Sequence, residues 1–285
     1  MKTVGVVVAY FPDLEELSFN IASYITELDA LIIWDNTPEQ APVFFQPLTE
    51  KYGEKIQVQS TGKNEGIGYA LNRAAEWGIN NHYDYLLTMD QDSHFVEGSL
   101  AHYLKMIQKA NRSDVVMYAP MVCLISGDDP AFDGEFREQK LAITSGSIMP
   151  LSVFEKIGFF QEELFIEGVD YEMCWRAQKH DLTVLKVNHV YLNHTVGNRK
   201  EFKFLGLKLH TYNYPPVRLY YSVRNLIYLY KKYKDKAVMI DYFYNNMFKR
   251  SIAILLLETN KRQKLCAMLL GFVHGMKGKL GVYKR

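Results

Sequence analysis

The architecture of this 285-residue chain is most readily inferred from one segment, Tyr85-Leu86-Leu87-Thr88-Met89-Asp90-Gln91-Asp92-Ser93. Its first five residues are mostly apolar and typical of a buried strand, and two carboxylates follow at once. Three similar apolar runs precede it, at residues 4–9, 31–34 and 56–60, and they alternate with helical patterns at 13–27, 39–52 and 68–77. Strands that alternate with helices predict right-handed crossovers and a mostly parallel α/β sheet covered on both faces.

The second half of the chain alternates less regularly. We expect strands at residues 115–119, 142–149 and 182–187, and helices at 151–157 and 171–180. From Pro215 onward the pattern is helical and rich in Tyr, Leu and Lys. We therefore expect an α/β domain over residues 1–210 and a helical C-terminal region over residues 211–285.

The composition is that of an ordinary globular protein, with 48% hydrophobic and 23% charged residues. Cys123, Cys174 and Cys266 are widely spaced and form no CxxC pair. This spacing argues against a disulfide framework or a structural zinc site and fits a reducing compartment. The N-terminal residues do not follow the pattern of a secretory signal peptide. We expect a cytoplasmic protein.

Charge is distributed unevenly along the chain. The net charge is +1, but residues 249–285 hold nine Lys/Arg and a single acid, Glu258, so this tail carries +8 and the rest −7. Such a tail suggests an anionic partner, and a membrane surface or a nucleic acid both have that property. The apolar runs 252–257 and 265–273 are far shorter than the ~20 residues that span a bilayer.

Basic residues flank these two runs, as in helices that lie in the headgroup plane of a membrane. They are Lys249, Arg250, Lys261, Arg262, Lys264 and Lys277. The alternative is that the apolar residues pack on the catalytic domain or on a second subunit of a homodimer. Both interpretations stay open at this point.

Polar residues follow each of the first four expected strands. They are Tyr10 after the first, Asp35 after the second, the loop 62–68 after the third and Asp90 after the fourth. Ligands of an open parallel sheet bind at the carboxyl ends of its strands. We therefore expect these residues to meet at one edge of the sheet.

Asp90 and Asp92 are the candidates for metal binding. Mg²⁺ and Mn²⁺ prefer oxygen ligands and are commonly held by one or two carboxylates together with substrate phosphates. Asp-x-Asp also occurs in solvated turns, but its position directly after a buried strand favours a site.

The glycine-rich loop 62–68 is not a dinucleotide fingerprint, since Leu71 stands where the last glycine is required, and the chain has no GK[ST] of a P-loop. It is either a turn into the next helix or a direct contact for a phosphorylated donor.

Together these residues resemble a known family. The motifs are Tyr10-Phe11-Pro12, Asp35-Asn36, Asn64-x-Gly66 with Asn72, Asp90-Gln91-Asp92-Ser93, and the segment from Phe165 to Glu172 with Arg176. In this order they are similar to the inverting family-2 glycosyltransferases of GT-A fold, a Rossmann-like sheet flanked by helices. They look most like the rhamnosyltransferase-type branch, in which a DQDS metal motif is typical.

The resemblance implies a role for each motif. Ala9, Tyr10 and Asp35 would contact a pyrimidine base, Asn64 and Gly66 the donor, and Asp90 the ribose or sugar. Asp92 would bind Mg²⁺ or Mn²⁺, with His194 near the diphosphate or the metal, and Arg224 would approach the leaving diphosphate. Asp170 would be the catalytic base, although Val169 stands where the family usually has Glu. From the residues alone, Asp170 also fits a helix N-cap, and Arg224 a packing position.

The expected reaction is transfer of a sugar, L-rhamnose by the resemblance, from a dTDP- or UDP-sugar to a glycan or lipid-linked acceptor in cell-surface polysaccharide synthesis. With that reading a nucleic acid is not an expected partner, and peripheral attachment to the inner face of the membrane is. Two alternatives are another nucleotide-dependent transferase and a non-catalytic nucleotide-sugar-binding protein.

Overall fold

The computed structural model describes residues 1–123, 129–194, 200–204, 207–211 and 213–283. The chain divides into two compact units. The first comprises Met1–Gln161 and Asp170–Thr195, and the second comprises Glu162–Val169 and Val196–Arg285. The expected boundary at residue 210 therefore falls inside the second unit.

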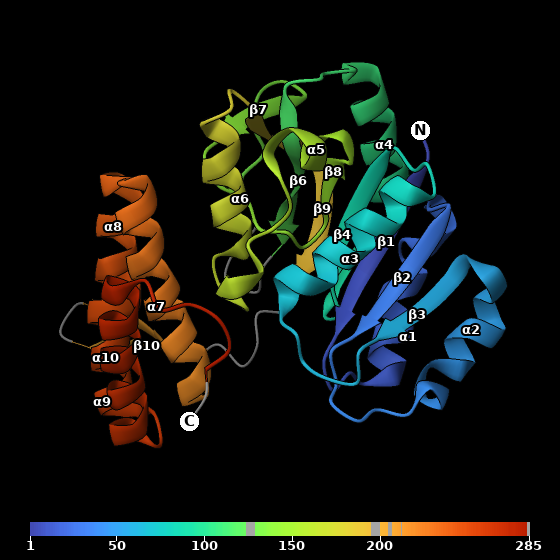
Figure 1. Cartoon of the computed structure of the whole chain (residues 1–285). Helices are drawn as coiled ribbons and strands as arrows, with labels where there is room; N and C mark the ends of the chain where they lie inside the picture. Colours follow the sequence, from blue (N-terminus) through green and yellow to red (C-terminus); the bar gives the residue numbers. More distant parts are fainter. Residues whose placement is uncertain (124–128, 195–199, 205–206, 212, 284–285) are drawn as a thin grey trace. The chain divides into compact units, whose positions relative to one another are not determined.

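Four parallel strands form one half of the sheet in the first unit, in the order β3-β2-β1-β4 (Figure 1). They are β1 (Thr3–Ala9), β2 (Ala30–Asp35), β3 (Ile56–Ser60) and β4 (Tyr85–Asp90). Each lies within one residue of the expected position. All six residues of β2 are buried, because a parallel strand covered by helices on both faces has no solvated side.

The other half of the sheet is mixed, in the order β8-β6-β9-β5 beyond β4, with β7 paired to β9. These strands are β5 (Ser93–Phe95), β6 (Val115–Cys123), β7 (Phe136–Gln139), β8 (Ser147–Pro150) and β9 (Thr183–His194). The strand expected at 142–149 begins late, because Gly146 adopts a φ of 73° in a turn before it. The short strands β5 and β7 carry too few residues for a periodic signal and were not expected.

Helices cover this sheet. They are α1 (Leu14–Ala22), α2 (Gln46–Tyr52), α3 (Ile67–Asn80), α4 (Ser99–Ala110), α5 (Ser152–Ile157) and α6 (Val169–Gln178), with short 3₁₀ turns at Ile25–Glu27, Pro42–Phe45, Gly53–Lys55 and Glu162–Leu164. The Asp13 carboxylate caps α1 by accepting from the backbone N–H groups of Glu15 and Glu16 at 3.0 and 2.9 Å. The helix expected at 39–52 is split, and Pro47 occupies the first turn of α2, where a missing N–H costs nothing.

The second unit contains the hairpin β10 (Lys200–Phe204) and β11 (Leu207–Thr211), which was not expected, and a group of helices. These are α7 (Pro216–Tyr233), α8 (Lys236–Tyr242), a π-helical segment Phe243–Lys249, α9 (Arg250–Leu257) and α10 (Lys261–Lys277). Helices α7, α9 and α10 share a small core: Leu219, Val223, Leu226, Ile227, Ile254 and Met268. Within the described residues, no helix combines the length and the apolar character that crossing a membrane requires.

Candidate active site

The strand register brings the expected ligand-binding residues to one edge of the sheet. Ala9 at the end of β1 lies opposite Asp35 at the end of β2, and Val8 lies opposite Asp90 at the end of β4. Asp35 in turn lies opposite Ser60 of β3. Four parallel strands thus end at the same level, which is where ligands of such sheets bind.

Gln91, in the turn after β4, ties two of these strand ends together. Its Oε1 accepts from the backbone N–H of Tyr10 at 2.7 Å, and its Nε2 donates to the carbonyl of Tyr10 at 3.3 Å. The carbonyl of Gln91 also accepts from the side chain of Asn20 in α1 at 2.8 Å. The glutamine between the two aspartates therefore fixes the turn that presents them.

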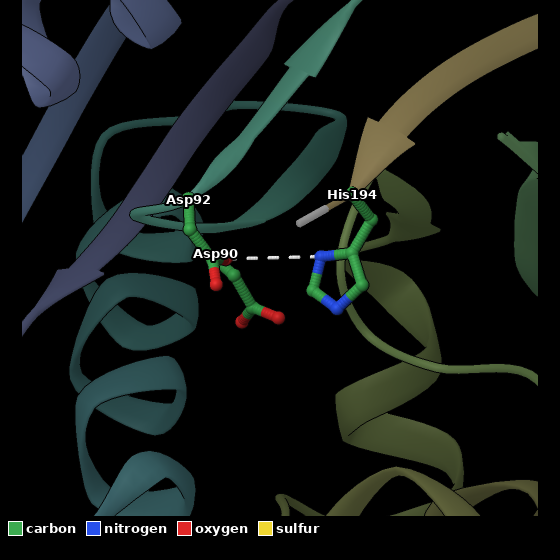
Figure 2. Close-up of side chains that lie close together, drawn as sticks. All are labelled: Asp90, Asp92 and His194. Carbon is green, nitrogen blue, oxygen red and sulfur yellow. Dashed lines mark ion pairs between the residues drawn. The ribbon is translucent and has the colours of Figure 1, made fainter. Parts of the chain in front are cut away.

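Asp90, Asp92 and His194 form a group whose ligand atoms all lie within 4.8 Å of one another. Figure 2 shows the two carboxylates and the imidazole facing the same space. The strand pairing explains this geometry, because β5 runs antiparallel to β9 with Ser93 opposite His194. A residue 102 positions after Asp92 in the sequence is thereby placed beside it.

A hydrogen-bond network orients His194. Its Nδ1 lies 2.6 Å from the hydroxyl of Ser93 and 3.7 Å from Oδ1 of Asp92. The hydroxyl of Ser145 donates to that of Ser93 at 2.9 Å and accepts from the backbone N–H of Asp90 at 3.4 Å. Two serines thus connect the imidazole to the backbone of the first aspartate.

The donor set of this group fits a divalent cation. Two carboxylates and one imidazole match the oxygen and nitrogen ligands of Mn²⁺, and oxygen ligands also suit Mg²⁺. All three residues are partly exposed, so the space between them is open to an incoming ion and its water. A hydrogen bond from a neighbouring side chain to one ring nitrogen, as Ser93 provides, is typical of metal-binding histidines.

Asp35 is a buried carboxylate with one oxygen engaged. Its Oδ1 accepts from the backbone N–H of Thr37 at 2.9 Å, and Oδ2 has no hydrogen-bond partner among the described residues. Ala9 is buried beside it, while the Tyr10 side chain is exposed at the rim. One oxygen of this carboxylate, at the carboxyl edge of the sheet, is thus held by the backbone.

The glycine-rich loop is attached to the end of β2. The side chain of Asn36 donates to the carbonyl of Gly66 at 3.2 Å, and Oδ1 of Asn64 accepts from the N–H of Gly66 at 3.0 Å. Gly66 has a φ of +87°, a conformation that a residue with Cβ rarely adopts, and α3 begins directly after it. The loop is therefore a shaped turn into α3, held at the same sheet edge.

Asp170 is the second residue of α6, in its first turn and not at an N-cap position. Its carboxylate accepts from the N–H of Tyr171 at 2.8 Å. Glu172 is buried and pairs with Arg176 at 2.8 Å, and Glu167 in the second unit pairs with Arg218 at 2.6 Å. Both neighbouring glutamates are thus committed to ion pairs. Asp170 is not part of the group of Asp90, Asp92 and His194.

Comparisons with known proteins agree with this fold. No family model matches the chain. The structure of GalNAc-T7 with UDP, GalNAc and Mn²⁺ superposes with a TM-score of 0.63 at 13% identity. The superposition covers 96% of this chain and 55% of GalNAc-T7, so this chain spans just over half the length of GalNAc-T7. The S. aureus TarS 1–349 structure in complex with UDP superposes with a TM-score of 0.61 at 15% identity, over 96% of this chain and 81% of that one. At these identities the likeness shows the fold alone.

A curated relative adds the activity. The dTDP-rhamnosyl transferase RfbF of Shigella flexneri is 25% identical over 256 residues, which cover 80% of this chain and 79% of the relative. The chain is a glycosyltransferase of GT-A fold. The sequence motifs had predicted this fold and this enzyme class, and both are confirmed.

Arg224 of this glycosyltransferase is fully buried in α7 of the second unit. Its guanidinium donates to the carbonyls of Gly281, Glu163 and Leu164, at 2.5, 3.1 and 3.0 Å. Burial lowers its pKa, although the guanidinium stays charged at any physiological pH. These contacts favour the packing interpretation of Arg224, because its donors serve three backbone carbonyls.

The sequence did not predict two residues that position the group of Asp90, Asp92 and His194. Ser145 carries no recognisable signal, since its role depends on the β4–β8 pairing that brings residues 88 and 147 together. The hydrogen bonds of Gln91 to the backbone of Tyr10 were also not predicted, because only the two aspartates of the Asp90-Gln91-Asp92-Ser93 motif suggested a role. Asn72, one of the family motif residues, exchanges two hydrogen bonds with the backbone of Phe160 and so fixes α3 to the chain before α6.

Proposed function

We propose that this glycosyltransferase is inverting and metal-dependent, and that it transfers L-rhamnose from dTDP-L-rhamnose to a hydroxyl of a glycan or lipid-linked acceptor during cell-surface polysaccharide synthesis. The observation that carries the proposal is the group of Asp90, Asp92 and His194 at the carboxyl edge of the sheet. The relative's name, dTDP-rhamnosyl transferase, supports the donor, and the Mn²⁺ in the GalNAc-T7 structure supports a metal.

The metal site in this proposal consists of Asp92 and His194, with Asp90 directed to the ribose or sugar. These residues would hold a divalent cation, whose charge would offset the charge that develops on the leaving nucleoside diphosphate. Ser93 keeps the imidazole pointed at this space, and Gln91 keeps the turn in place.

The base of the nucleotide lies, in this proposal, over the ends of β1 and β2. The open Oδ2 of Asp35 accepts the ring N–H of a pyrimidine, and Ala9 and Tyr10 border the same position. A buried carboxylate that holds one hydrogen bond already is well oriented for a second. Asn64 and Gly66 contribute the turn that faces the donor.

Asp170 is the proposed general base. It removes the proton from the acceptor hydroxyl as that oxygen attacks the anomeric carbon and the bond to the diphosphate breaks. The first turn of a helix favours a negative charge at this position. Glu172 and Glu167 are poor substitutes, since their carboxylates are held by arginines.

The test is a product analysis by NMR. The protein is incubated with dTDP-L-rhamnose, Mn²⁺ and either a saccharide acceptor or water alone, so that slow donor hydrolysis reports catalysis even without an acceptor. We expect release of dTDP and a sugar of inverted anomeric configuration, both abolished by EDTA. A binding protein without activity would release no dTDP. Retention of configuration would contradict the single-displacement mechanism, and turnover in EDTA would contradict metal dependence.

A further inference from the structure

Helix α10 has two apolar faces, and only one is covered within the second unit. Met268, Gly271 and Gly275 are buried, and both glycines approach the backbone of α7. On the outer face, Leu269, Val273 and Met276 follow one another at helical spacing and are 66%, 37% and 48% exposed. We call these three residues the α10 outer face. A helix that is apolar on both sides needs an apolar environment on both sides.

The segment just before α10 also exposes apolar side chains. Leu255, Leu256 and Leu257 end α9, and all three are exposed. They precede the first residue of α10 by only a few positions, and the two helices are in contact. The exposed apolar side chains of this region therefore come from two successive helices.

A buried ion pair removes one lysine and the only acid of residues 249–283 from the accessible surface. Glu258 and Lys264 are both buried, 2.6 Å apart, and Lys264 also donates to the side chain of Asn213 at 2.6 Å. Lys264 therefore cannot serve as one of the membrane-facing cations expected from the sequence. Because Glu258 is paired with Lys264, it does not offset the charge of the exposed lysines and arginines of this tail.

Within residues 261–279, the exposed charged side chains are all cations. Arg262 lies seven residues before Leu269 and so shares its side of the helix, Lys277 directly follows Met276, and Lys261 and Lys279 are exposed nearby. Pairing this face with the same face of a second copy would set cations against cations. An apolar strip flanked along its own helix by cations instead complements a surface that is apolar inside and anionic outside.

We propose that the α10 outer face docks the protein on an anionic lipid bilayer, with α10 lying in the headgroup plane. Leu269, Val273 and Met276 enter the acyl boundary, while Arg262 and Lys277 contact lipid phosphates. This attachment is peripheral, in keeping with the lack of a spanning helix among the described residues. It does not depend on the proposed glycosyl transfer and is measurable without donor or acceptor.

The first experiment is co-sedimentation of the full chain with vesicles of phosphatidylcholine alone or mixed with about equal phosphatidylglycerol. We expect recovery with the anionic vesicles only, weakened by salt because the phosphate contacts are screened. Leu269→Asn with Val273→Asn should lower the partition coefficient by at least about tenfold. Arg262→Gln with Lys277→Gln should lower it by about fivefold per cation.

Matched controls lie in the first unit. Val43→Asn and Lys105→Gln change an exposed valine and an exposed lysine there, and both should leave partitioning unchanged. Because Leu269 and Val273 are exposed, their replacement should also leave the circular dichroism and melting temperature unchanged.

A native cysteine supplies the second measurement. Cys266 is exposed and lies three residues before Leu269, whereas burial raises the pKa of the Cys174 thiol to about 12 and makes it unreactive. With Cys123→Ala, an environment-sensitive fluorophore on Cys266 should shift to the blue when anionic vesicles are added.

Three results would overturn the proposal. The first is equal recovery with neutral and anionic vesicles, and the second is binding that survives the Leu269 and Val273 changes with no shift at Cys266. The third is a dimer in sedimentation equilibrium that these same changes dissociate, which would assign the outer face to a second copy of the chain.

Discussion

Ser93 places its hydroxyl between the imidazole of His194 and the hydroxyl of Ser145. Removing it leaves Nδ1 of His194 without this partner, so the ring is no longer oriented towards Asp92. Loss of a hydrogen bond that orients a metal-binding histidine typically lowers metal affinity by about 10–100-fold. We predict that decrease for Ser93→Ala in a Mn²⁺ titration followed by electron paramagnetic resonance.

Two further variants serve as a positive and a negative control for this prediction. His194→Ala should weaken Mn²⁺ binding at least as much as Ser93→Ala, whereas Ser152→Ala, at an exposed position in α5, should leave it unchanged. Wild-type affinity in Ser93→Ala would show that the imidazole needs no support from this hydroxyl.

Asp170→Asn keeps the size of the side chain and removes its ability to take a proton. We predict normal donor binding and a turnover at least ~10²-fold slower, the lower range for loss of a general base. Turnover is measured under saturating acceptor, or as donor hydrolysis. A near-wild-type rate would exclude Asp170 as the base, and Glu172→Gln and Glu167→Gln would then be compared.

At the scale of elements, the four parallel strands and the carboxylates at their ends were predictable, because continuous apolar runs and the residues that follow them are local signals. The place of His194 was suggested only by family resemblance. Its proximity to Asp92 depends on the pairing of β5 with β9, and a three-residue strand such as Ser93–Phe95 has no periodicity to detect.

The hairpin β10–β11 and the late start of β8 were missed for a similar reason. The apolar residues Ala142, Ile143, Ile148 and Met149 suggest one continuous strand. Gly146, however, has a positive φ that turns the chain, and its N–H donates to the carbonyl of Thr88 at 2.8 Å. The spacing of residues along the sequence does not predict tertiary hydrogen bonds of this kind. The same is true of the hydrogen bonds from Arg224 to three backbone carbonyls.

Helices α7 and α10 pack closely because two glycines face α7. A Cβ at Gly271 would lie 2.5 Å from the carbonyl oxygen of Tyr220, and one at Gly275 would lie 2.5 Å from that of Arg224. Backbone cannot yield as a side chain can, so we predict that Gly275→Ala destabilises the protein by about 1–3 kcal/mol, the usual cost of overpacking.

The measurement is denaturant unfolding, with Cys266→Ala as a control on the exposed side of the same helix, for which we expect less than about 0.5 kcal/mol. A stable Gly275→Ala variant would mean that α10 lies farther from α7 than described.

At the scale of the whole molecule, we assign a different function to each of the two units. The first holds every residue of the proposed donor and metal site, and the second holds the surface proposed to face lipid. Variants in the α10 outer face should therefore leave donor binding in solution unchanged, and variants of Asp92 should leave vesicle binding unchanged. A liposome assay and a donor titration on the same two variants measure both.

The most direct test of the central claim is calorimetric titration of dTDP-L-rhamnose into the protein with Mn²⁺ and with EDTA. Asp92 belongs to the only group of metal-ligating side chains found among the described residues, so we predict one donor site per chain that requires Mn²⁺. Asp92→Ala should abolish this metal-dependent binding while the fold, judged by circular dichroism, persists. Equal donor affinity with and without Mn²⁺, or in Asp92→Ala and wild type, would contradict a metal-dependent glycosyltransferase site at Asp90, Asp92 and His194.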